Sequence, residues 1–504
     1  MTSAFDLICE LSWPIGMPAY QVKTCLSRPR IGVKRYRMRL IAIIALCLCF
    51  GQQGNGADRP NVLFIIADDL RDELGCYGAP HIRSPNIDRL AASGTLFTRA
   101  YCQYAVCGPS RASMLTGCYS GTTRAFNNRT HFRNANPRLV TLPQHFKNHG
   151  YRTAAIGKVL HDSQKDPLSW TDGHVFEQGL NYASPQYRDR RALIDGFHEE
   201  NGQLPLFEGP DVADDAYRDG VYANRAVASL EKYARGEQPF FLMVGFHKPH
   251  TPFNAPSRYW DLYSQADIDL AANQFPPKDA PAFAVAGARY VRSFKDIPTE
   301  GRLPGDLQRQ IKHAYFACIS YIDAQVGKLM HSLEANGQAE NTIVVFTSDH
   351  GYQLGEHDLW CKHTNFETST RVPLIIADPR MKQHGRRTSV MTELIDLTPT
   401  LIELVGLPEL NSADGDSVAA VLDDLSAAEN LPTTARSRYH KGGNTGISIR
   451  TEHFRYTEWR SSKTKMLVAR ELYDHNADPN ENSNVAELTD YAATVRRLER
   501  FVAP

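Results

Sequence analysis

Four apolar runs, each followed by polar residues, constrain the fold of this chain most. The first run covers residues 61–67 and leads directly into Asp68 and Asp69. A continuous apolar run is typical of a strand that is covered on both faces, as in a parallel sheet. Ligands of such sheets bind at the carboxyl ends of the strands, so we expect both carboxylates at a binding edge. Adjacent acidic residues often form a solvated turn, but the strand before them makes a metal site an equally good interpretation.

The three other runs deliver polar side chains in the same way. Residues 151–157 lead to Lys158 and His161, and residues 343–348 lead to Asp349 and His350. Residues 240–246 lead to the sequence His-Lys-Pro-His, whose last residue is His250.

Helical patterns lie between these strands. Residues 221–234 and 313–335 have helical spacing of their apolar side chains. Strands that alternate with helices indicate an α/β core.

Other segments depart from this alternation. Residues 255–310 are rich in Pro, Gly and Ala, which predicts an irregular excursion over the active face. Two short antiparallel strands are expected between residues 446 and 459, and a closing helix at residues 485–501. We therefore expect a large catalytic domain at residues 58–430 and a small sheet and helix subdomain at residues 431–504.

The composition is consistent with a large folded protein. The chain has 504 residues, of which 42% are hydrophobic and 22% are charged, so it can bury a substantial core. Its formal net charge is zero. This balance does not indicate a nucleic-acid partner, and any attraction for an anionic substrate must arise at a local site.

The first 57 residues have the features of an export signal. A basic segment at residues 34–39 precedes an apolar run at residues 40–50, and small residues follow at positions 54, 56 and 57. The run is too short to span a bilayer comfortably as a permanent helix, although a residual anchor is the alternative. We expect residues 1–37 to be an over-called start, followed by a signal peptide. The mature protein is then secreted, periplasmic or lumenal, without a permanent membrane span.

Ten cysteines do not form a disulfide framework here. Four of them fall in the expected leader, which leaves Cys76, Cys102, Cys107, Cys118, Cys318 and Cys361. If Cys107 is modified, an odd number remains, so these thiols cannot all pair internally. One or two bridges could still form in an oxidising compartment.

Cys107 has a distinctive place at the start of a predicted helix. Pro109 suits the first helical turn, and Gly117 can end a short helix. A group at such an N-terminus lies at the positive end of the helix dipole and near free backbone N–H donors, which favours an anion. An isolated cysteine in this position is more often a buried thiol with a packing role.

The sequence Cys-x-Pro-Ser-Arg at Cys107, with Leu115-Thr116-Gly117 downstream, resembles the signature of type I sulfatases. In that family the cysteine is oxidised to formylglycine, and the hydrated aldehyde is the nucleophile. Six further segments, in the expected order along the chain, resemble the iduronate-2-sulfatase branch: residues 74–78, 83–88, 105–107, 157–159, 244–250 and 448–451. The resemblance implies an alkaline-phosphatase-like α/β sandwich with a large central mixed sheet flanked by helices and a smaller C-terminal antiparallel-sheet domain.

The resemblance also assigns a metal site. It makes Asp68, Asp69, Asp349 and His350 ligands of one Ca²⁺ ion, and the modified Cys107 belongs to the same site. Oxygen ligands suit this hard cation, whereas a histidine ligand is unusual for it. The resemblance further implies a partner, the formylglycine-generating or another sulfatase-maturing enzyme.

The resemblance assigns the remaining catalytic roles as well. Lys158 and Lys362 hold sulfate oxygens, and Arg111 stabilises the hydrate. His250 helps to protonate the leaving alcohol, and His161 takes a proton from the second hydroxyl so that sulfate is expelled. The implied reaction is removal of a 2-O-sulfate from a terminal uronic acid of a sulfated carbohydrate by an exo-acting enzyme.

Two other functions compete with this interpretation. The same fold and a similar anion site serve the hydrolysis of phosphate mono- or diesters. A chain whose Cys107 is never oxidised would be a non-catalytic binder of sulfated glycans. Individually, a lysine is usually a solvated charge and a histidine usually a packed side chain, and His247, Lys248 and His357 receive no assigned role.

Overall fold

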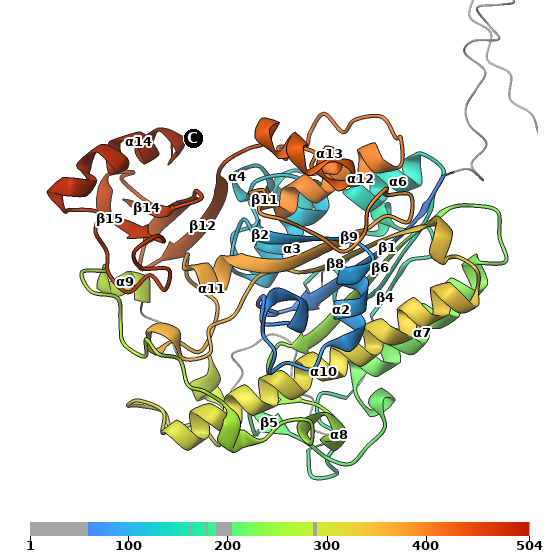
Figure 1. Ribbon diagram of the computed structural model, residues 1–504, viewed down its shortest axis with the longest axis horizontal. Coiled ribbons are helices and arrows are strands. Elements are labelled where there is room, and N and C mark those ends of the chain that lie inside the picture. Colours follow the sequence, from blue (N-terminus) through green and yellow to red (C-terminus); the bar gives the residue numbers. More distant parts are fainter. Residues whose placement is uncertain (1–58, 162–163, 177–179, 188–203, 286–289, 503–504) are drawn as a thin grey trace, which may run out of the picture. The chain divides into compact units, whose positions relative to one another are not determined.

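Parallel strands form the centre of a large mixed sheet in the computed structural model (Figure 1). The structure describes residues 59–161, 164–176, 180–187, 204–285 and 290–502, all of which belong to the unit 56–504. The strand order is β10-β2-β9-β8-β1-β6-β3-β4, and β11 also pairs with β2. The bounds are β1 Asn61–Asp68, β2 Thr95–Tyr101, β3 Arg152–Gly157, β4 His174–Val175, β6 Phe240–Pro249, β8 Thr342–Ser348, β9 Arg371–Ala377, β10 Arg386–Thr388 and β11 Thr392–Glu393.

Both faces of this sheet are covered by helices. All eight residues of β1 are buried, and successive side chains point to opposite faces. Leu63 and Ile65 pack into the core beneath α2 (Pro85–Ala92), α7 (Arg218–Tyr233) and α10 (Gly305–Ala335). Val62 and Phe64 pack into the other core, beneath α3 (Cys107–Thr116), α6 (Leu142–Asn148) and α12 (Leu397–Leu404). This double coverage explains why the central strands are continuously apolar.

A separate antiparallel sheet follows near the C-terminus. Its strands are β12 Ala435–Lys441, β13 Asn444–Arg450, β14 Phe454–Ser461 and β15 Leu467–Asp474, paired in that order. The helix α14 (Ala492–Val502) packs on it through Leu498, which joins Ile449 and Tyr456 in a small core. The α/β fold, its large mixed sheet and the smaller antiparallel sheet are therefore confirmed.

The remaining elements are short. The short helices are α4 Ser120–Thr123, α5 Phe132–Ala135, α8 Ser257–Trp260, α9 Ala282–Val285, α11 Glu367–Thr370 and α13 Ala419–Asp423. Strand β5 (Phe207–Glu208) pairs with β7 (Phe253–Asn254) in a two-stranded sheet.

Several predicted boundaries were wrong. Helix α10 begins at Gly305, after Pro304, so the irregular excursion ends earlier than residue 310. The first turns of α10 are polar on most sides, which hid them from an apolar pattern. The closing helix begins at Ala492 instead of residue 485. The prediction also missed β12, in which most side chains are polar.

Other predictions concern the cysteines and the leader. The six cysteines of the described residues are all free thiols. The expected signal peptide at residues 1–57 lies outside the described residues. Among the helices that the structure does describe, none has the length and apolarity needed to cross a membrane.

Two glycines allow β3 and β6 to approach closely where they end. The Lys158 N–H donates to the Gly245 carbonyl at 2.7 Å. Gly157 has φ +73°, a conformation that favours glycine, and a Cβ on Gly245 would lie 2.0 Å from the Lys158 carbonyl oxygen. This contact sets the position of the Lys158 backbone.

We predict that Gly245→Ala destabilises the protein, because the new methyl group meets main-chain atoms that cannot move independently. The expected loss in free energy of unfolding is about 1–3 kcal/mol, measured from the urea unfolding midpoint. Gly236→Ala is the matched control, because its Cβ would meet only the Tyr233 carbonyl oxygen at 3.6 Å. The control should change stability by less than about 0.5 kcal/mol. Equal effects of both substitutions would contradict the steric argument.

Candidate active site

Cys107 lies at the N-terminus of the buried helix α3. Val106 precedes the helix in an extended conformation, and Gly117 ends it with φ +66°. Every residue of α3 is buried, so the helix cannot shift toward solvent. Arg111 follows Cys107 by four residues, and side chains at this spacing lie on the same helix face. The predicted helix start and end are thus confirmed.

The acidic residues come from two adjacent parallel strands. Ala67 of β1 pairs with Ser348 of β8, so Asp68 and Asp349 follow at the same edge of the sheet. The Asp69 N–H donates to Asp349 Oδ1 at 3.3 Å. Asp69 itself has φ +66°, an uncommon conformation for a residue with a side chain, and such positions cluster at functional sites.

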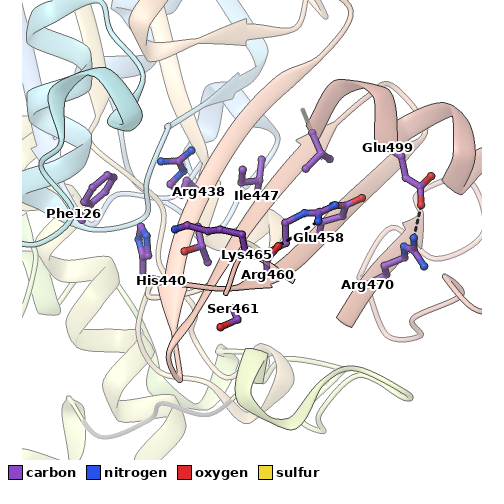
Figure 2. Close-up of a pocket in the computed structure, with 12 residues that line it drawn as sticks. Phe126, Arg438, His440, Ile447, Glu458, Arg460, Ser461, Lys465, Arg470 and Glu499 are labelled. Atoms are coloured by element: carbon purple, nitrogen blue, oxygen red, sulfur yellow. Dashed lines mark hydrogen bonds and ion pairs between the residues drawn. The ribbon is translucent and has the colours of Figure 1, made fainter. Parts of the chain in front are cut away.

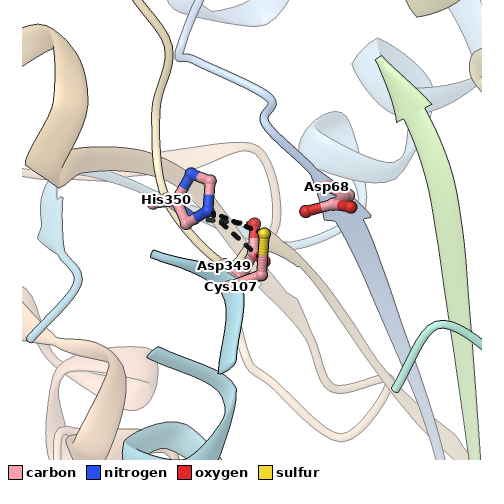
Figure 3. Close-up of side chains that lie close together, drawn as sticks. All are labelled: Asp68, Cys107, Asp349 and His350. Carbon is pink, nitrogen blue, oxygen red and sulfur yellow. Dashed lines mark hydrogen bonds and ion pairs between the residues drawn. The ribbon is translucent and has the colours of Figure 1, made fainter. Parts of the chain in front are cut away.

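His350 and Cys107 complete a buried cluster (Figure 3). His350 Nε2 lies 3.3 Å from Cys107 Sγ and 3.7 Å from Asp349 Oδ2. Its Nδ1 lies 3.4 Å from Asp69 Oδ1. One possible ligand atom from each of Asp68, Cys107, Asp349 and His350 lies within 4.8 Å of the others. The four residues come from β1, α3 and the turn after β8, and Figure 3 shows their side chains facing one another.

Three cationic side chains neutralise these carboxylates. Arg111 Nε lies 2.8 Å from Asp349 Oδ2, and its Nη2 lies 3.5 Å from Asp68 Oδ1. Lys158 forms an ion pair with Asp68. Lys362 Nζ lies 2.7 Å from Asp69 Oδ1 and 2.8 Å from Oδ2. Buried charges are tolerated only when they are paired, so these cations are required by the fold as well as useful for binding an anion.

The surroundings shift the pKa of the acidic side chains in opposite directions. Burial opposes ionisation of Asp68, but Lys158, His250 and Arg111 together hold its pKa well below the usual value. For Asp69, burial prevails over Lys362 and His350, and the pKa is raised. Burial and the neighbouring Asp68 also raise the pKa of the Cys107 thiol well above its usual value. An unmodified Cys107 is therefore a neutral thiol.

The two remaining predicted histidines lie at the same edge of the sheet. His250 Nε2 is 3.9 Å from Asp69 Oδ2, and its side chain is 14% exposed, whereas Lys362 is 5% and Asp69 0% exposed. His250 is therefore the most exposed of these three side chains. Burial, with Lys362 and Lys158 nearby, lowers the pKa of His250 well below its usual value. His161 is buried three residues after Lys158, in the turn that follows β3.

The unassigned residues of the His-Lys-Pro-His sequence hold the end of β6. The N–H groups of His247 and Lys248 each donate to the buried Asp219 carboxylate at 2.8 Å. Lys248 Nζ donates to the His250 carbonyl at 3.2 Å. These contacts fix the backbone that presents the His250 ring. His357, by contrast, packs on Phe366 with ring centroids 4.6 Å apart.

Tyr290, which no pattern in the sequence marks, lies against two site residues. Lys362 Nζ is 5.6 Å from the centroid of its ring, and the His250 ring lies 5.9 Å away in an edge-to-face arrangement. Tyr290 belongs to the irregular excursion, where no periodic pattern marks a contact residue. An aromatic face beside an ammonium group stabilises the cation in a buried setting.

The acidic cluster has the donor set of a cation site. Both oxygens of Asp68 are buried, and in the described residues their ion-pair partners are Lys158 and Arg111. Three carboxylates also crowd a small volume, where their mutual repulsion favours a bound cation. Carboxylate oxygens are the preferred ligands of Ca²⁺ and Mg²⁺, so the residues present fit a hard divalent ion.

Comparison with known proteins agrees with this geometry. The sequence model of the sulfatase family matches residues 60–407, which is most of the chain. The chain belongs to the sulfatase family. A second model, for the C-terminal part of N-sulphoglucosamine sulphohydrolase, matches residues 355–503 of this sulfatase.

Individual relatives place the chain within the family. Iduronate 2-sulfatase of Mus musculus is 34% identical over 538 residues, which cover 91% of this chain and 97% of the relative. Iduronate 2-sulfatase of Homo sapiens is 32% identical with the same coverage. The chain is thus a sulfuric ester hydrolase of the type I, iduronate-2-sulfatase-like branch.

Solved structures share the fold. The phosphonate monoester hydrolase of Agrobacterium radiobacter has a TM-score of 0.68 at 25% identity and covers 88% of this sulfatase and 94% of its own chain. A 2-O GAG sulfatase has a TM-score of 0.68 at 22% identity, with coverage of 88% and 91%.

We predict that Asp69→Asn lowers the metal content of the purified protein, because it removes one carboxylate from the cluster. A cation that binds only the folded state stabilises it, so a chelator should lower the thermal midpoint of the wild type and have less effect on the variant. Metal content is measured by plasma emission spectrometry. Asp72→Asn is the control, since Asp72 pairs with Arg371 at 3.0 Å and is 27% exposed. Full metal occupancy in Asp69→Asn would show that this ligand is misassigned.

Proposed function

We propose that this sulfatase removes the 2-O-sulfate from a terminal uronic acid of a sulfated glycan. The observation that carries the proposal is the placement of Cys107 among Lys158, Lys362 and Arg111, at the N-terminus of a buried helix. The likeness to two iduronate 2-sulfatases over nine-tenths of the chain supports a uronic acid as the sugar that carries the sulfate. Cys107 is only 1% exposed, which favours a chain end over an internal sugar as the group that reaches it.

The nucleophile of this proposal is the formylglycine made from Cys107. Thiolates are the reactive form of cysteine, and the raised pKa of Cys107 keeps an unmodified side chain neutral. A hydrated aldehyde has two hydroxyl groups: one attacks sulfur and displaces the alcohol, and the other loses a proton so that sulfate leaves and the aldehyde returns. The modification requires a sulfatase-maturing enzyme as a partner.

The cationic side chains bind and polarise the sulfate group. Lys158 and Lys362 hold its oxygens, and Arg111 stabilises the hydrate. Fixed charges in a buried site act without the reorganisation that water requires, so they favour the more negative transition state. Asp68, Asp69, Asp349 and His350 would hold a divalent ion, with Ca²⁺ as our assignment, which would supply further positive charge at this site.

Two histidines move the protons. His250 protonates the leaving alcohol, and His161 accepts the proton of the second hydroxyl. In the absence of substrate, Lys362 and Lys158 disfavour a charged His250. A bound sulfate anion between the lysines offsets this repulsion and raises the pKa of His250, so substrate binding itself prepares the acid.

A phosphate ester hydrolase is the competing function. The fold is shared with a phosphonate monoester hydrolase, and an anion site of this kind accepts phosphoryl as well as sulfuryl groups. Parallel assays with an aryl sulfate and the matching aryl phosphate separate the two. A lower kcat/KM for the sulfate would favour the phosphate hydrolase.

The first prediction of the proposal is an aldehyde at position 107. Hydrazide labelling followed by peptide mass spectrometry should mark the peptide that contains this residue. Cys107→Ser is the control, since it should carry no label and should lose at least about 10³-fold in kcat, because a serine has only one hydroxyl group. Active protein that contains only the unmodified thiol would overturn the mechanism.

The second prediction concerns the substrate. Three defined oligosaccharides are compared as substrates. One carries a 2-O-sulfated uronate at the non-reducing end, one carries it inside the chain, and the third carries a 6-O-sulfated hexosamine. Sulfate release should occur from the terminal uronate and should be at least about tenfold slower from the other two, because only a chain end reaches the buried centre. Equal release from internal and terminal positions would refute exo action, and release from the hexosamine alone would refute the uronate assignment.

A further inference from the structure

The C-terminal sheet carries a pocket, on the face that also packs against α14 (Figure 2). Its volume is about 870 Å³, within the range of small-ligand sites, and Phe126 forms part of its wall. The two faces of β12 serve different surroundings. Tyr439 and Lys441 point toward His363, which follows Lys362, whereas Arg438 and His440 point to the opposite face and line the pocket.

The pocket has an excess of positive charge. Its lining contains Arg438, Arg460, Lys465 and Arg470, but only two carboxylates. Glu458 pairs with Arg460 at 2.5 Å, and Glu499 pairs with Arg470 at 2.6 Å. Among the residues that the structure describes, no carboxylate lies within ion-pair distance of Arg438 or Lys465. These two side chains therefore offer charge that the protein does not neutralise locally.

The charges of Arg438 and Lys465 both affect the pKa of His440. Burial, followed by the charges of Arg438 and Lys465, lowers its pKa to about 4. The imidazole is neutral near pH 7, and its Nδ1 contacts the Tyr104 hydroxyl at 2.9 Å. Acidic groups in the neighbourhood would have raised this pKa, so the pocket is a positive environment for a ligand.

The geometry of the lining suits a charged sugar. The Arg438 guanidinium lies 5.8 Å from the centroid of the Phe126 ring, and no acceptor in the described residues takes a hydrogen bond from it. A planar fork of N–H donors binds sulfate or carboxylate through two parallel hydrogen bonds. Phe126 and Ile447 add apolar surface for the C–H face of a sugar, and Thr445 and Ser461 add hydroxyl groups.

We propose that this pocket is a second glycan-binding site, in which Arg438 and Lys465 hold a sulfated sugar that is not hydrolysed. The inference rests on the proposed function for the choice of a sulfated glycan as the anion. Such a site would keep a long polyanion on the enzyme between successive reactions and raise the effective concentration of its chain ends.

The test is the direct binding of a sulfated hexasaccharide whose non-reducing terminal sugar carries no sulfate, so that it is not a substrate of exo action. Arg438→Gln and Lys465→Gln should each raise Kd about tenfold, since each removes a charge-assisted hydrogen bond. Arg497→Gln and Lys463→Gln are matched controls. Arg497 lies 6.0 Å from the Phe454 ring centroid and Lys463 is exposed, and neither lines the pocket. Both controls should keep the wild-type Kd within twofold.

Each outcome decides the assignment. Equal Kd values for pocket variants and controls would overturn the second site. Equal binding of the desulfated hexasaccharide would assign recognition to the uronate carboxylate and overturn the role of sulfate. Equally tight, Arg438-dependent binding of poly-glutamate would overturn the assignment of a glycan as the ligand. If Arg438→Gln fails to fold, Lys465→Gln alone decides, because Lys465 is exposed on the β14–β15 hairpin. Absence of sulfate ester hydrolysis in the wild type would refute the proposed function instead, without changing the binding comparison.

Discussion

The pairing of buried carboxylates with buried cations is the interaction on which the active site depends. Asp68, Asp69 and Asp349 are completely buried, and an isolated charge in such a place would be prohibitively costly. Arg111, Lys158 and Lys362 compensate them from a helix, a strand end and a loop. The same ionic contacts that permit burial also bring the three cations together beside Cys107. The arrangement of charges that the fold needs is therefore also the one on which the proposed function depends.

Strand register determines which charges meet. Strand β1 lies between β8 and β6 in the sheet, and β3 follows β6. All four strands run parallel, so their carboxyl ends carry Asp68, Asp349, His250 and Lys158 to one edge. The close contact of Gly157 with Gly245 then turns the chain so that Lys158 reaches Asp68. A side chain at either glycine would separate the two strand ends and move the ammonium group away from its partner.

The sequence could predict those parts that depend on local patterns. Continuous apolar strands and the Pro109 and Gly117 signals of α3 belong to this class, because burial and helix ends leave direct traces in composition. It could not predict β12, whose polar side chains serve two different surfaces, or the contact of Tyr290 with Lys362. Both depend on neighbours far away in the chain. The sequence also gave no sign that an unmodified Cys107 thiol is held neutral, since this follows from its burial beside Asp68.

The C-terminal sheet is part of the active-site framework. Glu367, in α11 between Lys362 and β9, forms ion pairs with Arg455 of β14 and, at 2.9 Å, with Arg450 of β13. Arg455 also contacts Glu481 at 2.6 Å, and although burial opposes ionisation, Arg455 and His475 lower the pKa of Glu481 to about 2. These ion pairs fasten the loop that carries Lys362 to the small sheet. Through β12, the same sheet contacts His363 on one face and forms the cationic pocket on the other, so one element lines both the loop of Lys362 and the pocket.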